Sequence, residues 1–231
     1  MPSDCLPRIS IIIPALDEAE SIAATVHSAL QLAGSPQVIV VDGGSRDSTA
    51  ALAAQAGAVM IRAPQGRGPQ MHAGALAASG QVLWFLHADT LPPEDALQHI
   101  ARALVDHSTV GGNFEIRFGG EFMSARFLTR VYRHLARMGL RYGDSGYFVR
   151  RDAYFAAGGF RDFPIFEDLD LLGRLQRLGR FVRVSGVVTS SSRRFEGRLF
   201  ALVFLRWTAM QILYWLGVPP RSLGKLYRHV R

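Results

Sequence analysis

Short apolar runs alternate with helix-like stretches through the first half of the chain. Each run is continuous rather than alternating, which is typical of strands that are buried on both faces. These runs predict strands at Ile9–Ile13, Val38–Val41, Val59–Arg62 and Val82–Leu86. Between and after them, the spacing of apolar residues and the glycines or prolines near the segment ends predict helices over Glu18–Leu32, Ser48–Ala56, Pro69–Ala78 and Pro93–Val105. The alternation indicates an α/β fold with a mostly parallel sheet covered by helices on both sides.

The second half of the chain is less regular. Its patterns predict strands at Gly112–Phe118 and Tyr147–Val149, helices at Phe122–Met138 and Glu167–Leu178, and a mostly extended segment at Phe181–Val188. With 231 residues, 48% of them hydrophobic and 19% charged, the chain has the composition of a folded domain and not of a disordered tail. Its single cysteine, Cys5, excludes an intramolecular disulfide and any site built from several cysteines.

Charge is distributed unevenly along the chain. Residues 1 to 115 carry 5 basic and 11 acidic groups, a balance of −6, whereas residues 116 to 231 carry 21 basic and 8 acidic groups, a balance of +13. This bias reflects either arginine-rich codon usage or a surface that faces an anion such as phospholipid or a phosphorylated substrate. Nucleic acid is not expected as a partner, since no helix-turn-helix, zinc-finger or RNP pattern accompanies the charge. Residues 1 to 8 lack the apolar core of a secretory signal, so we expect a cytoplasmic protein.

Polar loops follow three of the predicted strands, at residues 14 to 18, 42 to 49 and 87 to 92. In open parallel sheets, the loops at the carboxyl ends of strands carry the ligand site. Asp17 can serve as a helix cap. Asp42 has no evident capping role, and a carboxylate at that strand tip can accept a hydrogen bond from a nucleotide base or a ribose. Asp89 can hold a hard divalent cation against a diphosphate, and His87 points to the same side of an extended chain.

Two further motifs carry chemistry. Gly66-Arg67-Gly68 leads directly into a predicted helix, so backbone N–H groups and a guanidinium converge as a plausible receptor for a diphosphate. Glu167, Asp168 and Asp170 fall in the first turn of another helix. Acidic residues are common there because the helix dipole favours them. Beside a diphosphate site, one of them is a candidate general base for an acceptor hydroxyl.

In this order, the motifs resemble the inverting family 2 glycosyltransferases of the GT-A fold, and in particular a short bacterial subgroup. The resemblance covers roughly residues 8 to 195 and is carried by Ser10-Ile11-Ile12-Ile13-Pro14, Val41-Asp42-Gly43-Gly44-Ser45, His87-Ala88-Asp89 and Glu167-Asp168. It implies a Rossmann-like, mixed but mostly parallel sheet flanked by helices. We therefore expect a glycosyltransferase domain over residues 1–195, followed by an apolar helix and a basic tail over residues 196–231.

The resemblance also implies a role for each matching residue. Ala15, Asp17 and Asp42 would line the nucleotide pocket, Arg67 would lie near the nucleotide or its phosphates, and His87 would belong to the donor site. Asp89 would bind Mg²⁺ or Mn²⁺ as the aspartate of the family's DxD motif, Asp168 would be the catalytic base, and Glu167 would contact the acceptor. Gly143-Asp144-Ser145-Gly146-Tyr147 and Gly158-Gly159-Phe160 look like the acceptor-side segment.

Two features depart from the family pattern. His87 stands where the motif usually has an aspartate, and the family's later arginine-tryptophan motif has only partial candidates in Arg193-Arg194-Phe195 and Arg206-Trp207. The implied reaction is transfer of a sugar from a nucleotide-diphosphate donor to an unidentified acceptor. Two alternatives are a nucleotidyltransferase that builds sugar nucleotides and a membrane-associated nucleotide-binding module without catalysis. A nucleotidyltransferase would be expected to have a glycine-rich loop with a lysine or arginine directly after the first strand, and this sequence does not have one there. The Glu167-Asp168 pair disfavours a module without catalysis.

The segment Leu199–Val218 is 20 residues long, and 16 of these are apolar. That is nearly the length needed to span a bilayer, but Arg206 in its interior is costly in a membrane. Arg221, Lys225, Arg228 and Arg231 follow it, as expected of a segment resting on an anionic leaflet. The segment is therefore an interfacial helix on the inner face of the cell membrane, a helix packed on the domain or on a homodimer mate, or a true span.

Overall fold

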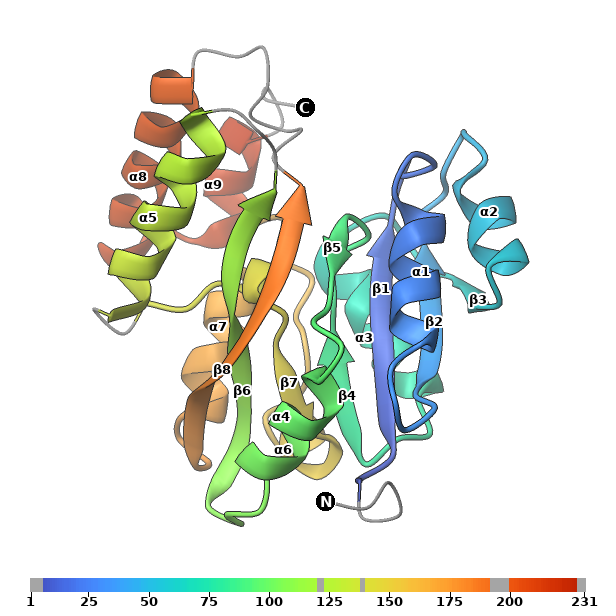
Figure 1. Cartoon of the computed structure of the whole chain (residues 1–231). Coiled ribbons are helices and arrows are strands. Elements are labelled where there is room, and N and C mark those ends of the chain that lie inside the picture. The colour runs from blue at the N-terminus through green and yellow to red at the C-terminus, as the bar shows by residue number, and fades with distance from the viewer. Residues whose placement is uncertain (1–5, 120–122, 138–139, 192–199, 228–231) are drawn as a thin grey trace.

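The structure of the chain is a computed structural model that describes residues 6–119, 123–137, 140–191 and 200–227. An eight-stranded sheet in the order β3-β2-β1-β4-β7-β6-β8-β5 forms its centre (Figure 1). The strands are β1 Ile9–Ala15, β2 Gln37–Asp42, β3 Val59–Arg62, β4 Val82–Phe85, β5 Thr90–Leu91, β6 Thr109–Gly119, β7 Phe148–Arg150 and β8 Arg180–Ser191. The pairs β1–β2, β1–β4, β2–β3 and β6–β8 are parallel, and the pairs β4–β7, β6–β7 and β5–β8 are antiparallel. The expected mixed, mostly parallel sheet is therefore confirmed.

The helices are α1 Ile22–Leu30, α2 Thr49–Gln55, α3 Arg67–Ala77, α4 Ala96–Ala103, α5 Met123–Arg137, α6 Arg151–Ala156, α7 Glu167–Leu175, α8 Phe200–Trp215 and α9 Pro220–Tyr227, with a 3₁₀ turn, η2, at Gly143–Ser145. The first of them starts later than the expected Glu18. The backbone N–H of Glu18 donates to Thr49 Oγ1, and that of Ala19 donates to Asp47 Oδ2, so both residues belong to the loop before the helix.

Successive side chains along the central strands point alternately into two hydrophobic cores, one on each face of the sheet. Ile11 and Ile13 of β1 pack with residues of α1, α4 and α5 on one face. Ile12, between them, packs with residues of α3, α6 and α7 on the other. All three isoleucines are fully buried. The continuous apolar run of β1 is thus explained by a strand covered on both faces.

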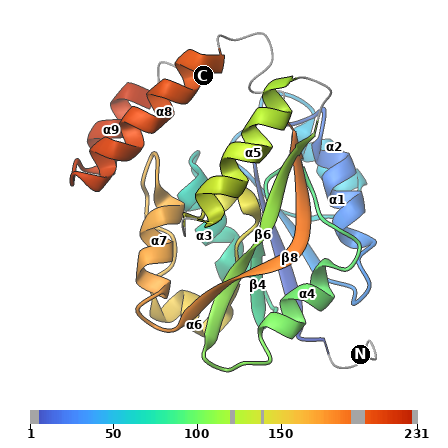
Figure 2. The same ribbon diagram turned by 60° about the vertical axis from the view of Figure 1, so that its left-hand side comes forward.

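The C-terminal helices α8 and α9 pack side by side and form a layer apart from the sheet (Figure 2). They contact the rest of the chain through a small third core, in which Met210 and Leu223 bury themselves against Ile165 and Phe166. The Phe166 ring lies 4.8 Å from the ring of Tyr214, measured between centroids. The layer therefore rests on the segment that leads into α7.

Parts of the expected C-terminal organisation fall outside the described residues. These include the boundary at residue 195, the Arg193-Arg194-Phe195 motif candidate and residues 228–231 of the basic tail. The other motif candidate, Arg206-Trp207, lies in α8, where the Trp207 ring is 6.5 Å from that of Phe166. Within the ranges that the structure describes, no helix is long and apolar enough to cross a membrane.

Gly68, in the first turn of α3, offers a test of how closely this helix approaches the loop before α7. A Cβ atom at this position would collide with the backbone carbonyl oxygen of Arg161. We predict that Gly68→Ala lowers the free energy of unfolding by about 1–3 kcal/mol, the usual cost of overpacking. Gly173→Ala is the matched control, because a Cβ there meets nothing within 4 Å in the helix α7. It should raise the free energy of unfolding by about 0.5–1 kcal/mol, as alanine replaces a helical glycine. Urea denaturation of both variants checks the pair, and equal effects would contradict the close approach.

Candidate active site

The strands β1 and β2 end next to each other, with Ala15 paired to Asp42. The amide of Gln70, in the first turn of α3, bridges the two ends. Its Nε2 donates to the carbonyl oxygens of Ala15 and Val41, at 2.8 Å each, and the residue is 3% exposed. Because these bonds are buried, they fix the start of α3 at the carboxyl edge of the sheet.

Asp17 and Asp42 connect the loops that follow these strands. Oδ1 of the buried Asp42 accepts the backbone N–H of Ser45 at 3.0 Å, which closes a local turn. Asp17, with a φ of 53°, accepts the N–H of Arg46 at 2.8 Å and donates its own N–H to Ser45 Oγ at 3.0 Å. Asp17 thus crosslinks two loops instead of capping the next helix, and Asp42 has a structural role that the sequence did not indicate.

Arg67 stands at the start of α3 and points toward two carboxylates. Its Nε lies 2.8 Å from Glu167 Oε1, and its Nη1 lies 3.8 Å from Asp144 Oδ1. The preceding Gly66 adopts a φ of 141° and donates its N–H to Gln70 Oε1. The predicted phosphate-binding arginine is therefore already oriented by acidic partners from η2 and α7.

Asp144 also joins His87 to this group. His87 Nδ1 lies 3.5 Å from Asp144 Oδ1, and the hydroxyl of Tyr132 lies 3.5 Å from Asp144 Oδ2. The sequence singled out the segment around Asp144 but not its carboxylate. Its role depends on three segments meeting in space, and local sequence carries no signal for that. The same holds for Gln70.

Glu167 and Asp168 are the first two residues of α7, and both line a pocket together with Arg67 and His87. Glu167 is 2% exposed, and its Oε2 has no hydrogen-bond partner among the described residues. Asp168 is partly buried. Its Oδ2 accepts the N–H of Gly143 at 2.6 Å, and its Oδ1 accepts the N–H of Leu169 at 2.8 Å. A buried carboxylate oxygen without a hydrogen-bond partner is costly in a folded protein. The Oε2 of Glu167 can therefore accept a hydrogen bond from a ligand.

Burial raises the pKa of both carboxyl groups. For Glu167 the pKa rises from 4.5 to about 6, because burial and then the charge of Asp168 outweigh the opposing effect of the Arg67 guanidinium. Burial also raises the pKa of Asp168, against the lowering effects of Arg67 and of the Gly143 hydrogen bond. Each group is therefore a better proton acceptor, when ionised, than a carboxylate on the surface.

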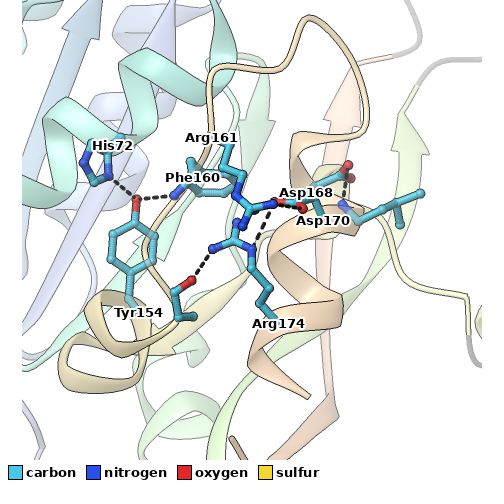
Figure 3. Close-up of polar contacts among 9 residues, drawn as sticks. His72, Tyr154, Phe160, Arg161, Asp168, Asp170 and Arg174 are labelled. Atoms are coloured by element: carbon cyan, nitrogen blue, oxygen red, sulfur yellow. Dashed lines mark hydrogen bonds and ion pairs between the residues drawn. The ribbon is translucent and has the colours of Figure 1, made fainter. Parts of the chain in front are cut away.

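A polar network holds the loop that leads into these two acids (Figure 3). Asp170, one turn into α7, pairs with Arg161 at 3.1 Å and with Arg174, which also donates to the carbonyl oxygen of Ala157. On the other side, the Tyr154 hydroxyl accepts the N–H of Phe160 at 3.0 Å and contacts His72 Nδ1 at 3.0 Å. The loop is thus tied to α3, α6 and α7 at once.

Asp89 follows β4, two residues beyond His87. Its side chain is partly exposed, and among the described residues its Oδ1 accepts only a long hydrogen bond of 3.5 Å from Thr90 Oγ1. None of the described basic side chains forms an ion pair with it. Its backbone carbonyl oxygen accepts the N–H of Ser191 at 3.1 Å, which holds the loop against the end of β8. The carboxylate is therefore available to a cation.

The predicted residues thus fall into two neighbouring groups. Arg67, His87, Glu167 and Asp168 line one pocket, whose other walls are Met71, Phe85, Gly143, Tyr147 and Phe160. Ala15, Asp17 and Asp42 lie at or just after the ends of β1 and β2, which Gln70 bridges, and Asp89 follows two residues after His87. All of them lie at the carboxyl edge of the parallel strands or at the helix starts beside it, where open α/β sheets bind ligands.

Comparison with known proteins identifies the family to which the chain belongs. The family described as glycosyl transferase family 2 matches residues 10–162, which is more than half of the chain. The chain therefore belongs to glycosyl transferase family 2, and the predicted family is confirmed. This membership argues against the nucleotidyltransferase alternative.

Curated relatives match over parts of their length. The probable glycosyltransferase YdaM of Bacillus subtilis is 23% identical over 204 residues, which cover 77% of this chain and 49% of YdaM. An uncharacterized glycosyltransferase of Mycobacterium tuberculosis is 34% identical over 82 residues, which cover 35% of this chain and 36% of that protein. The chain thus spans between a third and a half of the length of these relatives.

Solved structures share the fold. Glucosyl-3-phosphoglycerate synthase from Mycobacterium tuberculosis, in complex with Mn²⁺, uridine diphosphate and phosphoglyceric acid, is 21% identical with a TM-score of 0.64, over 94% of this chain and 81% of that one. The mannosyltransferase PcManGT from Pyrobaculum calidifontis, in complex with GDP-Man and Mn²⁺, is 17% identical with a TM-score of 0.69, over 91% and 63%. The GT-A fold expected from the sequence is confirmed.

The raised pKa of Glu167 predicts a pH dependence of stability. Between pH 6 and 4.5 the folded state binds more protons at this group than the unfolded state does, so stability falls as pH rises through this window. Relative to Glu167→Gln, the wild type should gain up to about 2 kcal/mol of unfolding free energy as the pH falls from above the folded pKa to below the unfolded one. Urea denaturation across this range checks the prediction. The exposed Glu94→Gln is the control and should track the wild type, and a pH-independent difference for Glu167→Gln would refute the raised pKa.

Proposed function

We propose that this chain transfers a sugar from a nucleotide-diphosphate donor to an acceptor hydroxyl, by a single displacement that inverts the anomeric centre. One observation carries the proposal: Arg67, His87, Glu167 and Asp168 line one pocket at the carboxyl edge of the sheet, where Asp144 contacts both Arg67 and His87. Membership of glycosyl transferase family 2 supports the reaction class. Related folds hold uridine diphosphate or GDP-Man with Mn²⁺, which supports a donor of the same kind.

The residues around Asp89 fit a divalent metal of the Mg²⁺ or Mn²⁺ type. Such ions prefer oxygen ligands, and Mg²⁺ usually binds one or two carboxylates together with waters and substrate phosphates. Asp89 offers one partly exposed carboxylate without a described cationic partner, and the described residues contain no cluster of three acidic, histidine or cysteine side chains that would form a closed metal cage. Asp89 would therefore hold the ion together with the donor. When bound, the ion supplies neutralisation of the diphosphate charge.

Asp168 acts as the general base. Its carboxylate accepts the proton of the acceptor hydroxyl, whose oxygen attacks the anomeric carbon as the bond to the nucleotide diphosphate breaks. The hydrogen bonds from Gly143 and Leu169 hold the carboxylate in one orientation, and burial keeps it basic. The free Oε2 of Glu167 accepts a hydrogen bond from the acceptor and positions it beside Asp168.

Arg67 stabilises the negative charge that develops on the departing diphosphate. A guanidinium suits this role, because it stays ionised and donates two parallel hydrogen bonds to phosphate oxygens. Its contacts with Glu167 and Asp144 hold it toward the pocket before the donor arrives. Ala15, Asp17 and Asp42 would bind the nucleoside at the ends of β1 and β2, and His87 would contact the donor close to Asp89.

Asp168→Asn tests the base. We expect the transfer rate to fall by about 10²–10⁴-fold, the usual contribution of a general base, while the affinity for the donor stays within a few fold. Turnover with a panel of nucleotide sugars, and calorimetric titration of the nucleotide diphosphates, measure the two quantities. NMR of the product gives its anomeric configuration. Asp162→Asn is the control, since this exposed aspartate lies in the loop that leads into α7. Near-normal turnover by Asp168→Asn would remove Asp168 from the role, and a retained configuration would exclude the single displacement.

Asp89→Ala tests the metal site. We expect the variant to bind nucleotide diphosphates equally weakly with and without Mn²⁺ or Mg²⁺, because the carboxylate that links the ion to the protein is lost. Isothermal titration calorimetry of uridine and guanosine diphosphates measures this. Glu94→Ala, an exposed acid five residues further along, should keep the wild-type metal dependence. Unchanged affinity in Asp89→Ala, with the metal still effective, would show that another group holds the ion.

A further inference from the structure

The helix α8 presents an apolar face on the side that does not pack on the chain. Leu205, Ala209, Ile212 and Leu216 follow the i, i+4, i+7, i+11 spacing of a single helix face, the last of them just past the helix end. Leu205 is 65% exposed, Ile212 48% and Leu216 75%, and Trp215 beside them is 57% exposed. A contiguous apolar row of this kind on a soluble surface marks an interaction site.

The packing of the domain does not account for this row. The opposite side of α8 carries Met210, Trp207 and Tyr214, which contact Phe166 and its neighbours. A helix that only packs on the domain needs one apolar face, with polar residues on the other. Since α8 has apolar residues on both, the outward row requires another explanation.

Charge identifies what can cover the row. Residues 197–231 contain six basic residues and no acidic one: Arg198, Arg206, Arg221, Lys225, Arg228 and Arg231. Of these, Arg221 and Lys225 lie exposed on α9, four residues apart and therefore on one face. A surface that complements this region must be negatively charged as well as apolar.

The helix α5 adds positive charge at the same end of the molecule. Arg126, Arg130, Arg133 and Arg137 repeat the same i, i+4, i+7, i+11 spacing, and all four are exposed. Residues 123–137 contain no acidic residue, and of the four arginines only Arg133 has a carboxylate partner within the described residues, Glu115 at 2.8 Å. Figures 1 and 2 both show α5, α8 and α9 projecting from the same upper end of the fold.

We propose that this end of the molecule docks on an anionic phospholipid bilayer, with the apolar row of α8 inserted at the headgroup level. Interfacial helices bind in this way, through apolar residues in the acyl boundary and basic residues at the phosphates. Tryptophan, as at position 215, favours the same depth. A second copy of the chain is the poorer occupant, because a symmetric contact would bring two strongly basic surfaces together.

Co-sedimentation of the full chain with vesicles tests the proposal. We expect at least about tenfold more binding to vesicles of phosphatidylcholine with phosphatidylglycerol than to phosphatidylcholine alone, and weaker binding as salt screens the charges. Arg221→Ser with Lys225→Ser should reduce the affinity for the anionic vesicles by about 25-fold, at about fivefold for each cation. Equal binding to both kinds of vesicle, or none to either, would overturn the proposal.

A matched pair of variants tests the apolar row itself. Ile212→Glu with Leu216→Glu should abolish binding to the anionic vesicles. Leu76→Glu in α3 with Val105→Glu just past α4 adds the same charge at positions that are 61% and 64% exposed, and should leave most of the binding intact. Thermal midpoints check that both variants are folded. Equal losses of vesicle binding in the two variants would overturn insertion of the apolar row, because net charge alone would then govern binding. If instead the wild type is a dimer by light scattering, does not bind vesicles and becomes monomeric in Ile212→Glu with Leu216→Glu, the row joins two copies and the membrane proposal fails.

Discussion

The buried contact between Arg67 and Glu167 is the interaction on which the site depends. It connects the start of α3 to the start of α7, two elements that are far apart in the sequence and lie on the same face of the sheet. A carboxylate that is 2% exposed would be expensive without a cation beside it, and the guanidinium only partly offsets that cost, as the raised pKa of Glu167 shows. Gln70 and Asp144 then extend the contact to the ends of β1 and β2 and to His87.

The parallel half of the fold could be predicted from sequence because its physical signals are local. The strands β1, β2 and β4 are buried on both faces, and each is followed by a polar loop, so their positions and their shared edge follow from hydrophobicity alone. The same argument placed Asp42, His87 and Asp89 at that edge. Glu167 and Asp168 were singled out as an acidic cluster, but acids in a first turn are common for structural reasons, so their roles were assigned through the resemblance to the family.

The remaining features depend on contacts that no local pattern encodes. The helix α6 has six residues and β5 has two, too short for a periodicity to be recognised. The strand β8 continues to Ser191 through a glycine and several serines, because it pairs along β6 with irregularities in register. Asp144 and Gln70 matter only because distant segments approach them. Asp17 was expected to cap a helix. Its carboxylate instead accepts the N–H of Arg46, which is 29 residues away in the sequence and therefore leaves no local signal.

Phe166 is one of the residues through which the C-terminal layer contacts the segment leading into the site. It is 3% exposed, lies in the left-handed region with a φ of 62°, and has its ring against Tyr214 of α8 while its backbone continues into Glu167 and Asp168. The C-terminal layer therefore packs directly on the residue that precedes the two carboxylates. Thermodynamic linkage then sets a reciprocal relation: if attachment of that layer alters the affinity for the donor by some factor, the donor alters the attachment by the same factor.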